Sequence, residues 1–585
     1  MRASDYIADF LAEHGIRHCY GYQGTMIAFF VDAVCRDPRL FNHVCYNEQG
    51  AAFAAVGEAK ITGRPTLAYA TSGPGAANLI SGIADAYYDS APVIFITGQL
   101  NTYEYQNIPG LKQHGFQEMN IVDMVSPVVK YARQVKTTEE LPDILEKAYH
   151  AAVSGRPGPV LIDLPMNIQR EEINTDKISV SAGESSEVPY DDLCEIADLI
   201  IHSISEAERP VLLLGNGVVN QDRGALRDMI SKLGLPVVTS LPGRDILPED
   251  HPLNFGYLGY AYGHRYANII INKKTDLIIS LGCNLNHRQT GMKTEIFAEK
   301  ARIIRVDIDL AELQRKVHKD DICCYADCKD IIRVVSEKLD AAPLSGKEKK
   351  YRKLKTWLEI CSGIKSLLMV YDQSDPLRQP NSLVSMISDK TENAGAIICD
   401  VGQHQMWGAQ SYKLRGHQRM IFSGGHGAMG FSLPAAIGAH YACGKPVITI
   451  TGDGSLQMNI QELQWIHREK IPVTVFVMNN RALGLIHQQQ DALFQSRYFS
   501  SVKEGGYLVP DFCRVADAYG INSYKAPDGE MLENILEHID LNVPNLVEII
   551  LPEDSCAAPK TSFGEAMHNQ SPLIPENIMN HILAL

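Results

Sequence analysis

Two apolar runs joined by a helical pattern restrict the fold of this chain more than any other feature. Residues 447–451 (VITIT) and 473–478 (VTVFVM) are typical of strands buried on both faces, and residues 458–469 have the spacing of an amphipathic helix. This order predicts two parallel strands joined by a right-handed crossover. The carboxyl ends of the two strands then lie at the same edge of a sheet, which is where α/β proteins bind ligands.

Polar residues follow both strands at that edge. Asp453 stands between Gly452 and Gly454, and Asn480 follows the second run. Glycines let backbone amides approach a phosphate, and a carboxylate beside a carboxamide supplies the oxygen ligands that magnesium prefers. Each piece alone is ordinary turn chemistry. Their spacing predicts a site for a diphosphate bridged to the protein by magnesium.

Three segments of the chain show this alternation of strands and helices. Apolar strand-like runs occur at 66–70, 92–96, 159–164, 211–214, 237–240, 277–281 and 303–308. A polar stretch at 173–192 and a charged stretch at 345–355 separate the segments. We therefore predict an α/β protein of three doubly wound parallel-sheet domains. Their expected ranges are 1–172, 190–344 and 362–550, followed by a tail, 551–585, that is extended and then helical.

Composition excludes several classes of function. The formal net charge is −15 with no basic cluster, which argues against nucleic acid as a partner. No apolar run approaches the roughly 20 residues of a membrane span, and the start lacks the apolar core of an export signal. The 13 cysteines are scattered, and Cys323, Cys324 and Cys328 lack the paired spacing of a zinc site. We expect a soluble, cytoplasmic protein.

Five further motifs accompany the Gly-Asp-Gly and Asn-Asn pair. They are NEQGAAFAAVGEA (from 47), ATSGPGAANLISG (from 70), HGFQE (114–118), VGQHQMWGAQ (401–410) and SGGHGAMGFSLPAAIGA (423–439). Together they resemble, over nearly the whole chain, the thiamine diphosphate-dependent acetohydroxyacid (acetolactate) synthase family. The resemblance implies decarboxylation of a 2-keto acid, expected to be pyruvate, and transfer of the acyl carbanion equivalent to a carbonyl acceptor.

The resemblance also implies roles for single residues. Glu48 would share a proton with the cofactor's pyrimidine, whose imino tautomer can then remove the thiazolium C2 proton; taken alone, it is equally an acid at a helix start. The side chains of Asp453 and Asn480 and the carbonyl of Ala482 would bind magnesium. Met429 would wedge under the cofactor, although a lone methionine is more often core filler. The other implied cofactor contacts are Ser72, Pro74, Asn78, Val401, Gly402, Gln403, His404, Gly427, Gly452, Gly454, Ser455, Leu483, Gly484 and Leu485.

Two further sites follow from the same resemblance. Thr25, Phe116 and Gln117 would face the substrate. The run LLLGNGVVN (212–220) resembles a nucleotide loop, and the central domain of the family binds FAD. The positions that match this FAD site are Gly215, Gly217, Leu241, Gly259, Gly282, Asp307, Asp309 and Asp327. Because related central domains keep the fold with the site empty or ADP-filled, a bound FAD and a vestigial site both stay open.

Several substrate-side residues depart from the family pattern. Thr25 replaces a glycine, Met166 a lysine and Gln489 a tryptophan, and Asn284-Leu285-Asn286-His287 stands where the family has Arg-Phe-Asp-Asp. His426 and His487 add polar groups near the expected pocket mouth. These changes leave the cofactor motifs intact and fit an acceptor with hydroxyls, such as a keto sugar, or a cyclic diketone. The alternatives are hydrolysis of a diketone and a non-catalytic cofactor-binding protein.

Subunit composition follows from the placement of the two halves of the site. Glu48 belongs to the first domain and Asp453 to the third. The family completes each site with the first domain of one subunit and the third of its neighbour. The resemblance therefore implies a homodimer or a homotetramer with shared sites.

Overall fold

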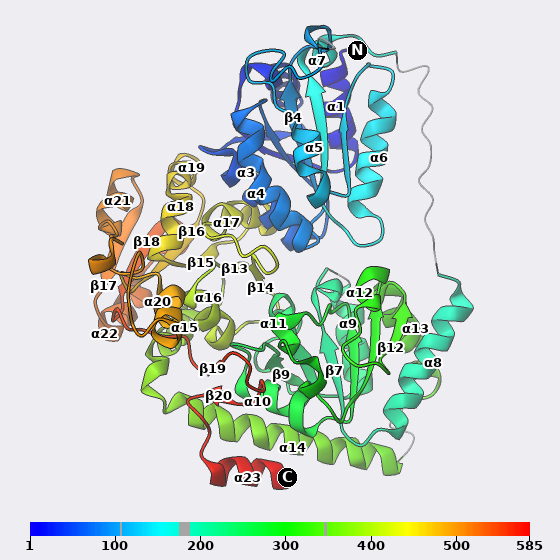
Figure 1. Ribbon diagram of the computed structural model, residues 1–585, viewed down its shortest axis with the longest axis vertical. Helices are drawn as coiled ribbons and strands as arrows, with labels where there is room; N and C mark the ends of the chain where they lie inside the picture. Colours follow the sequence, from blue (N-terminus) through cyan, green and yellow to red (C-terminus); the bar gives the residue numbers. More distant parts are fainter. Residues whose placement is uncertain (106–107, 175–187, 221, 344–347) are drawn as a thin grey trace.

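The chain forms three α/β domains and a C-terminal segment in the computed structural model (Figure 1). The structure describes residues 1–105, 108–174, 188–220, 222–343 and 348–585, so most of the expected joint at 173–192 lies outside it. Each domain has a six-stranded sheet whose paired strands are parallel, with helices on its faces. The predicted architecture of three doubly wound sheets is confirmed.

The first domain has the strand order β2-β1-β3-β4-β6-β5. Its inner strands β3, β4 and β6 are mainly apolar and buried along their whole length, as such a sheet requires. Its strands are β1 (His18–Gly21), β2 (Phe41–Val44), β3 (Thr66–Ala70), β4 (Val93–Gln99), β5 (Tyr131–Gln134) and β6 (Val160–Pro165). Its helices are α1 (Ala3–Glu13), α2 (Ala28–Arg36), α3 (Glu48–Thr62), α4 (Pro74–Tyr88), α5 (Ile121–Val125), α6 (Leu141–Val153) and α7 (Met166–Arg170).

The central domain has the order β12-β11-β10-β7-β8-β9. Its strands are β7 (Pro210–Leu214), β8 (Val237–Thr239), β9 (Asn254–Tyr257), β10 (Leu277–Leu281), β11 (Arg302–Asp307) and β12 (Ile322–Tyr325). Its helices are α8 (Tyr190–Glu206), α9 (Arg223–Leu233), α10 (Arg265–Ile269), α11 (His287–Thr290), α12 (Leu310–Gln314), α13 (Cys328–Ala341) and α14 (Glu348–Gln373).

The third domain has the order β14-β13-β15-β16-β18-β17. Its strands are β13 (Ala396–Cys399), β14 (Arg419–Phe422), β15 (Val447–Gly452), β16 (Val473–Asn479), β17 (Asn522–Ala526) and β18 (Asn545–Ile550). Its helices are α15 (Gln379–Lys390), α16 (Gln403–Ser411), α17 (Ser432–Cys443), α18 (Asp453–Met458), α19 (Leu463–Glu469), α20 (Gly484–Leu493), α21 (Phe512–Ala518) and α22 (Gly529–His538).

The crossover between β15 and β16 differs from the single helix expected at 458–469. Helix α18 begins at Asp453 itself, and Asn459, with φ −135° and ψ 31°, breaks the path before a 3₁₀ turn and α19. The side-chain amide of Asn459 donates to the carbonyl of Gly430 and to Oε1 of Gln49, both at 3.0 Å. Tertiary contacts outside the helical pattern therefore decide where this helix breaks.

Helix α14 begins at Glu348, inside the expected boundary at 345–355, of which residues 345–347 lie outside the described residues. Trp357, Cys361, Ile364 and Leu368 pack into the core of the central domain. The charged stretch thus begins a helix of the central domain, and the passage to the third domain follows α14.

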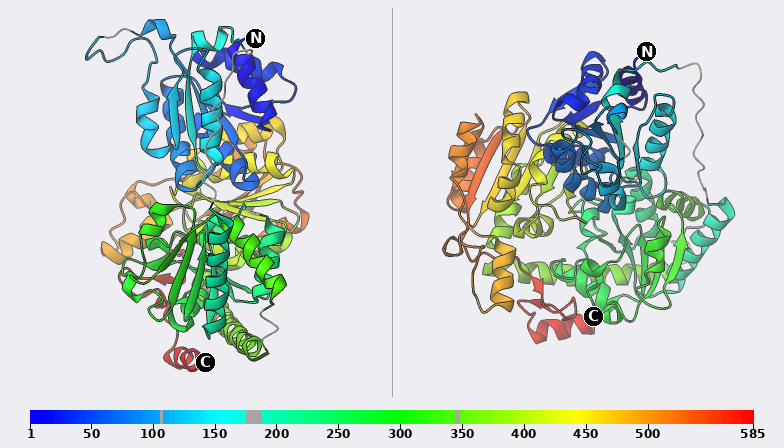
Figure 2. Two further views of the ribbon diagram at one scale, coloured as in Figure 1. Left: turned by 90° about the vertical axis from the view of Figure 1, so that its right-hand side faces the viewer. Right: turned by 45° about the horizontal axis from the view of Figure 1, so that its top comes forward.

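The C-terminal segment is extended and then helical, as expected. It contains β19 (Lys560–Thr561), β20 (Gln570–Ser571) and α23 (Glu576–Ala584). Met567 and Ile582 belong to the same core cluster as the buried residues of α14. Helix α23 lies beside α14 (Figures 1 and 2). The segment therefore returns from the third domain to the central one.

Helices α3 and α17 join the first and third domains at close range. A Cβ on Gly57 would lie 2.3 Å from the carbonyl oxygen of Ala435, and one on Gly438 would lie 1.9 Å from that of Ala54. The two helix backbones approach so closely because neither glycine carries a side chain. Helix α3 begins at Glu48, so this contact helps to fix the first-domain part of the site relative to the third domain.

Candidate active site

Three adjacent strands of the third domain end at one edge of its sheet. Strand β15 pairs with β13 on one side and with β16 on the other, in parallel. Asp400, Asp453 and Asn480 each directly follow one of these strands or begin the next element. The crossover rule therefore predicted the correct meeting point for Asp453 and Asn480, while Asp400 is an addition from the structure.

Asp453 is a buried carboxylate with one unpartnered oxygen. Its side chain is 2% exposed; Oδ1 accepts from the amide of Gly454 at 2.7 Å and from the Tyr507 hydroxyl at 3.2 Å, whereas Oδ2 has no hydrogen-bond partner. Burial raises the pKa of Asp453 to about 6, and the Gly454 amide, the Tyr507 hydroxyl and the nearby amides of Arg481 and Ala482 offset part of that rise. A buried carboxylate oxygen without a partner is unfavourable in the protein alone. It fits a divalent cation, which would supply the missing contact.

Residues that follow β13 and β16 in the chain surround this edge. The amide of Asn480 donates to Oε1 of Gln403 at 3.3 Å, and the hydroxyl of Ser455 donates to the carbonyl of Val401 at 2.8 Å. The buried ring of His404 leaves Nε2 without a partner, and burial lowers its pKa to about 3. The structure thus brings together the residues expected around the diphosphate, including Gly402, Gly452, Ala482, Leu483 and Gly484. Leu485 lies in the first turn of α20.

The loop that carries Met429 is held by Asp400. The amides of Gly430 and Ser432 each donate to a different oxygen of this buried carboxylate at 2.9 Å. The methyl carbon of Met429 lies 3.3 Å from the Cβ position of Gly454, so Met429 lies beside the residues that follow β15. Gly427 adopts φ 73° with open space around it. Sequence reasoning missed Asp400, although it directly follows the apolar run AIIC, just as Asp453 follows its own strand.

Glu48 is the first residue of α3. It is 7% exposed, and its Oε2 accepts from the side-chain amide of Asn78 at 2.9 Å. Asn47 caps the helix by accepting from the amide of Gln49. Ser72, 1% exposed, leaves its hydroxyl without a partner, and Pro74 begins α4 nearby in the chain. The expected first-domain cofactor residues therefore share the carboxyl edge of the first sheet.

Glu462 joins the third domain to this edge. Both its carboxylate oxygens accept from the amide of Tyr46, at 3.1 and 3.2 Å, two residues before Glu48. Burial raises the pKa of Glu462 to about 7, while the amides of Tyr46 and Asn47 hold it down in part. With the contact between Asn459 and Gln49, this bond fixes the start of α3 against the third domain. Sequence reasoning missed Glu462 because its partner is more than 400 positions away.

The expected substrate-side residues lie on loops of the first domain. Thr25 is exposed on a short turn after β1, and Phe116 is 80% exposed. Gln117 has φ 64°, and its carbonyl oxygen lies 2.7 Å from the Cβ position of Gly73. The loop after β4 projects from the edge of the chain (Figure 2, left). A single chain therefore leaves this side of the site open to solvent.

The departures from the family pattern have separate environments. His426 stacks on Tyr88 with ring centroids 6.1 Å apart. His487 is buried and stacks on Tyr498 at 4.3 Å, and Gln489 is exposed. His487 is therefore engaged in packing, whereas His426 and Gln489 remain accessible.

A cavity of about 770 Å³ lies where the three domains meet. Of the positions expected to bind FAD, six line it: Gly217, Leu241, Gly259, Gly282, Asp307 and Asp327. Gly215 instead packs against the carbonyl of Gly282, and Asp309 caps α12 by accepting from the amide of Ala311. The cavity is also lined by Asn284, Asn286 and His287, which belong to the segment that departs from the family pattern, and by the next residue, Arg288.

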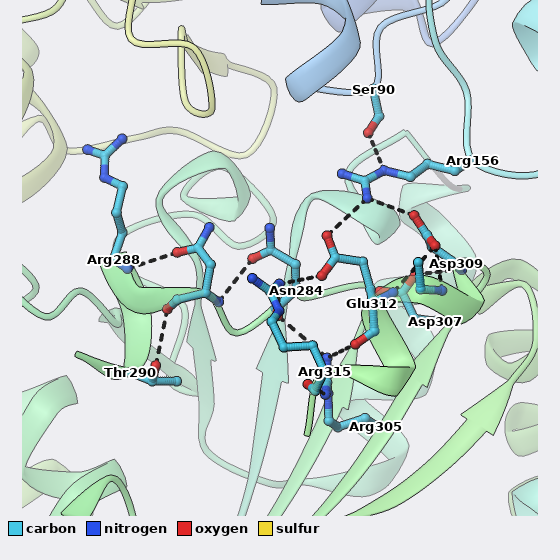
Figure 3. Close-up of polar contacts among 12 residues, drawn as sticks. Ser90, Arg156, Asn284, Arg288, Thr290, Arg305, Asp307, Asp309, Glu312 and Arg315 are labelled. Atoms are coloured by element: carbon cyan, nitrogen blue, oxygen red, sulfur yellow. Dashed lines mark hydrogen bonds and ion pairs between the residues drawn. The ribbon is translucent and has the colours of Figure 1, made fainter. Parts of the chain in front are cut away.

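Arg156 of the first domain closes one side of this cavity (Figure 3). Its Nε donates to the Ser90 hydroxyl at 2.8 Å, and its Nη1 pairs with Asp309 at 3.0 Å and Glu312 at 3.2 Å. Arg288 lies opposite and donates to the carbonyl of Gly424 at 2.7 Å. The cavity therefore offers two guanidinium groups and, at Asp307 and Asp327, two carboxylates. Sequence reasoning missed Arg156, which follows a glycine in a loop and carries no strong local signal.

The C-terminal segment passes close to the carboxyl edge of the third sheet. Gln403 donates to the carbonyl of Ser555 and to Oε1 of Gln488, each at 2.8 Å. The amide of Ala557 donates to that same oxygen of Gln488 at 3.1 Å. Ser555 is thus bonded to Gln403, which itself contacts Asn480, and Ala557 reaches Gln403 through Gln488.

None of the described helices is long and apolar enough to cross a membrane.

This fold and this edge define a class of protein: a three-domain α/β protein with buried polar residues gathered at the carboxyl edge of its third sheet. The chain matches the families described as the N-terminal TPP binding domain (residues 1–124), the central domain (197–335) and the C-terminal TPP binding domain (400–549) of thiamine pyrophosphate enzymes.

Curated relatives narrow the class further. The chain is 37% identical to a probable acetolactate synthase large subunit of Methanocaldococcus jannaschii, covering 94% of this chain and 92% of the relative. It is 34% identical to acetolactate synthase 1, chloroplastic, of Zea mays (97% and 88%) and 33% identical to acetolactate synthase isozyme 1 large subunit of Escherichia coli K12 (96% of each). The chain belongs to the acetolactate synthase-like branch of the thiamine pyrophosphate enzymes.

Proposed function

We propose that the protein is a thiamine diphosphate-dependent carboligase, which decarboxylates a 2-keto acid, first of all pyruvate, and joins the remaining acyl unit to a carbonyl acceptor. The observation that carries this proposal is the unpartnered, buried Oδ2 of Asp453 at the shared edge of β13, β15 and β16. The thiazolium of the bound cofactor supplies the electron sink for decarboxylation. Membership of the acetolactate synthase-like branch supports the same reaction.

Magnesium is the ion that this edge fits best. Its ligands would be the carboxylate of Asp453, the side-chain oxygen of Asn480 and the carbonyl of Ala482, all hard oxygen donors. Gln403 helps to orient Asn480, and Asp400 helps to place Met429. The third domain would thus hold the diphosphate, and the first domain would hold the pyrimidine.

Glu48 is the proposed proton-handling group. Its burial at the start of α3 shields it from bulk water, and Asn78 holds one of its oxygens in place. The other oxygen is left to share a proton with the pyrimidine of the bound cofactor. Thr25, Phe116 and Gln117 would then limit the space for the acceptor.

The large cavity is proposed to hold FAD. Its volume suits a dinucleotide-sized ligand, Arg156 and Arg288 can face phosphate groups, and Asp307 and Asp327 can accept from hydroxyls. The Ser240 hydroxyl at its wall is buried without a partner, which also fits a ligand. The visible absorption spectrum of the purified protein tests this proposal, because a colourless protein would contradict it.

The acceptor is proposed to carry hydroxyl groups, as a keto sugar does. Gln489 and Thr25 are exposed at positions where the family has different residues. A diketone hydrolase is the second candidate, because the same departures would also suit a cyclic diketone attacked by water. Product analysis separates the two.

A second copy of the chain is proposed to complete the site, as a homodimer or a homotetramer. In one chain Phe116 and Thr25 face solvent, and the exposed apolar residues Leu493, Phe499 and Leu508 leave a large surface uncovered. Ser555 and Ala557, which contact Gln403 and Gln488, are proposed to bring the start of the segment 551–585 to the border of the completed site. The 13 cysteines are all free thiols, which supports a cytoplasmic location.

The test uses purified protein with magnesium, thiamine diphosphate and pyruvate, alone and with aldehyde or keto-sugar acceptors. Release of carbon dioxide together with a ligation product is expected, and Glu48→Gln should abolish both. Carbon dioxide release from no 2-keto acid, in protein that binds the cofactor, would contradict the proposal and favour a binding protein. Cleavage of a diketone without ligation would favour the second candidate.

A further inference from the structure

A buried carboxylate inside the first sheet has no role in the site described so far. Asp163 lies on β6 and is 1% exposed, in the run VLIDLP whose residues are all buried. It stands directly across from Thr97 on β4 and Gln134 on β5. A buried charge is costly unless hydrogen bonds satisfy it.

Three neutral donors satisfy Asp163. The Thr97 hydroxyl donates to Oδ1 at 2.7 Å, and the side-chain amides of Gln99 and Gln134 donate to Oδ2 at 3.1 and 2.9 Å. Among the described residues, only these three neutral side chains and burial influence the carboxylate, and no cationic side chain does. Burial raises the pKa of Asp163 to about 6, while these hydrogen bonds hold it down in part.

The two glutamine amides connect Asp163 to the loop after β4. Nε2 of Gln99 also donates to the carbonyl of Met119 at 2.9 Å, and Nε2 of Gln134 also donates to the Tyr105 hydroxyl at 3.2 Å. Both contacts need the amide NH₂ group to face the loop. Asp163 enforces that orientation because a carboxylate accepts and cannot donate.

The loop held in this way carries the substrate-side residues. Tyr105 packs against His114 with ring centroids 5.1 Å apart, and His114 contacts Glu118 at 2.8 Å. Between them and Met119 lie Phe116 and Gln117. The loop is therefore anchored at Tyr105 and Met119 by one buried carboxylate.

We propose that Asp163 is a positioning residue, which fixes the amides of Gln99 and Gln134 and through them holds the loop that presents Phe116 and Gln117 to the substrate. The substrate part of this inference rests on the proposed carboligase function. The anchoring of the loop is independent of it.

Asp163→Asn is the direct test, because it keeps the shape but removes the negative charge and leaves one acceptor oxygen where the three donors now share two. We expect faster hydrogen exchange of residues 108–120 in the cofactor-free protein. We also expect kcat/KM for ligation to fall by roughly ten- to hundredfold, as for a displaced positioning group. Thiamine diphosphate affinity should stay within about twofold, because no cofactor contact changes.

Asp321→Asn is the matched control. Asp321 is 3% exposed in the central domain and accepts from the amide of Val317 at 2.8 Å. Its replacement should leave the exchange of residues 108–120 and kcat/KM unchanged. An equal loss in both variants would show a general effect of removing a buried carboxylate and would overturn the proposal.

Measuring hydrogen exchange of the loop over a range of pH distinguishes a positioning role of Asp163 from a merely structural one. Protonation of Asp163 imitates asparagine, so loop protection in the wild type should fall as pH drops through about 6. Asp163→Asn should lack this step. The other titratable groups near the loop, Glu104, Tyr105, His114 and Glu118, are unchanged in the variant and serve as an internal reference.

A compensating change sharpens the assignment. Gln134→Glu in the Asp163→Asn background restores a donor and acceptor pair between positions 134 and 163, and the Tyr105 hydroxyl can donate to the new carboxylate. Partial recovery of loop protection is expected. Normal exchange and kinetics in Asp163→Asn would overturn the proposal. If the wild type formed no ligation product while Asp163→Asn still showed faster exchange, only the proposed function would be overturned.

Discussion

The glycine contact between α3 and α17 gives a prediction whose magnitude follows from the structure. In Gly438→Ala the new Cβ would stand 1.9 Å from the carbonyl oxygen of Ala54. This is far inside the ~3.5 Å of an ordinary contact, so α3 must move by more than about 1 Å. Both atoms belong to helical backbone, which cannot turn aside as a flexible side chain can.

Two opposing terms set the change in stability. Overpacking costs about 1–3 kcal/mol, and exchanging glycine for alanine inside a helix returns about 1 kcal/mol. The net loss of up to about 2 kcal/mol lowers the melting temperature by about 4–8 °C, at roughly 2–4 °C per kcal/mol for a unit of 150–250 residues. Ligation activity should fall as well, because the displaced helix begins at Glu48.

Gly363→Ala is the matched control for this prediction. Gly363 lies inside α14, is exposed, and has no atom within 4 Å of its Cβ position. Alanine meets no clash there and only gains the higher helix propensity, so the melting temperature should rise slightly while kcat stays unchanged. Both variants are measured by scanning calorimetry and by ligation kinetics. If Gly438→Ala melted at or above the wild-type temperature with full activity, the close contact of α3 and α17 would not be what sets the site.

Four further predictions concern single residues. Glu48→Gln should lower kcat by about a hundredfold or more while cofactor binding, followed by fluorescence titration, stays intact. Asp453→Asn should weaken magnesium-dependent cofactor retention by about tenfold or more, since even outer partners of a metal site carry that much; unchanged affinity would contradict the metal assignment. Burial raises the pKa of Glu462 from 4.5 to about 7, so its contribution to stability falls as pH rises between those values. The melting temperature of Glu462→Gln relative to wild type should accordingly increase from pH 5 to pH 8, and a constant difference would speak against this. Arg156→Ala should reduce the visible flavin absorbance of the purified protein, and full absorbance would remove Arg156 from the FAD site.

Local patterns predicted the parts of the molecule that depend on neighbouring residues. Continuous apolar runs correctly located strands such as β3, β10 and β16, because strands covered on both faces need apolar side chains throughout. The crossover rule then placed Asp453 and Asn480 at one edge, since right-handed connections bring successive parallel strands into the same direction. Family motifs indicated Glu48, whose catalytic role stays a prediction.

Other features could not be read from local patterns. The helix expected over 458–469 breaks at Asn459 because its amide contacts Gly430 and Gln49. The charged stretch near 350 looks like a linker, but Trp357 and the apolar face beyond it pack on the central sheet. The charged residues lie on the solvent side of the helix, so they do not show whether its other face is buried.

By itself the sequence determined the three sheets and which residues stand at their carboxyl ends. Tertiary structure alone decided that Asp400 holds the Met429 loop, that Glu462 binds the start of α3, and that Arg156 closes a cavity shared by three domains. Strand and helix patterns arise from contacts within a few residues, so a short stretch of sequence is enough to predict them. Hydrogen bonds between groups that lie many residues apart depend on how whole domains pack, and no local pattern carries that information.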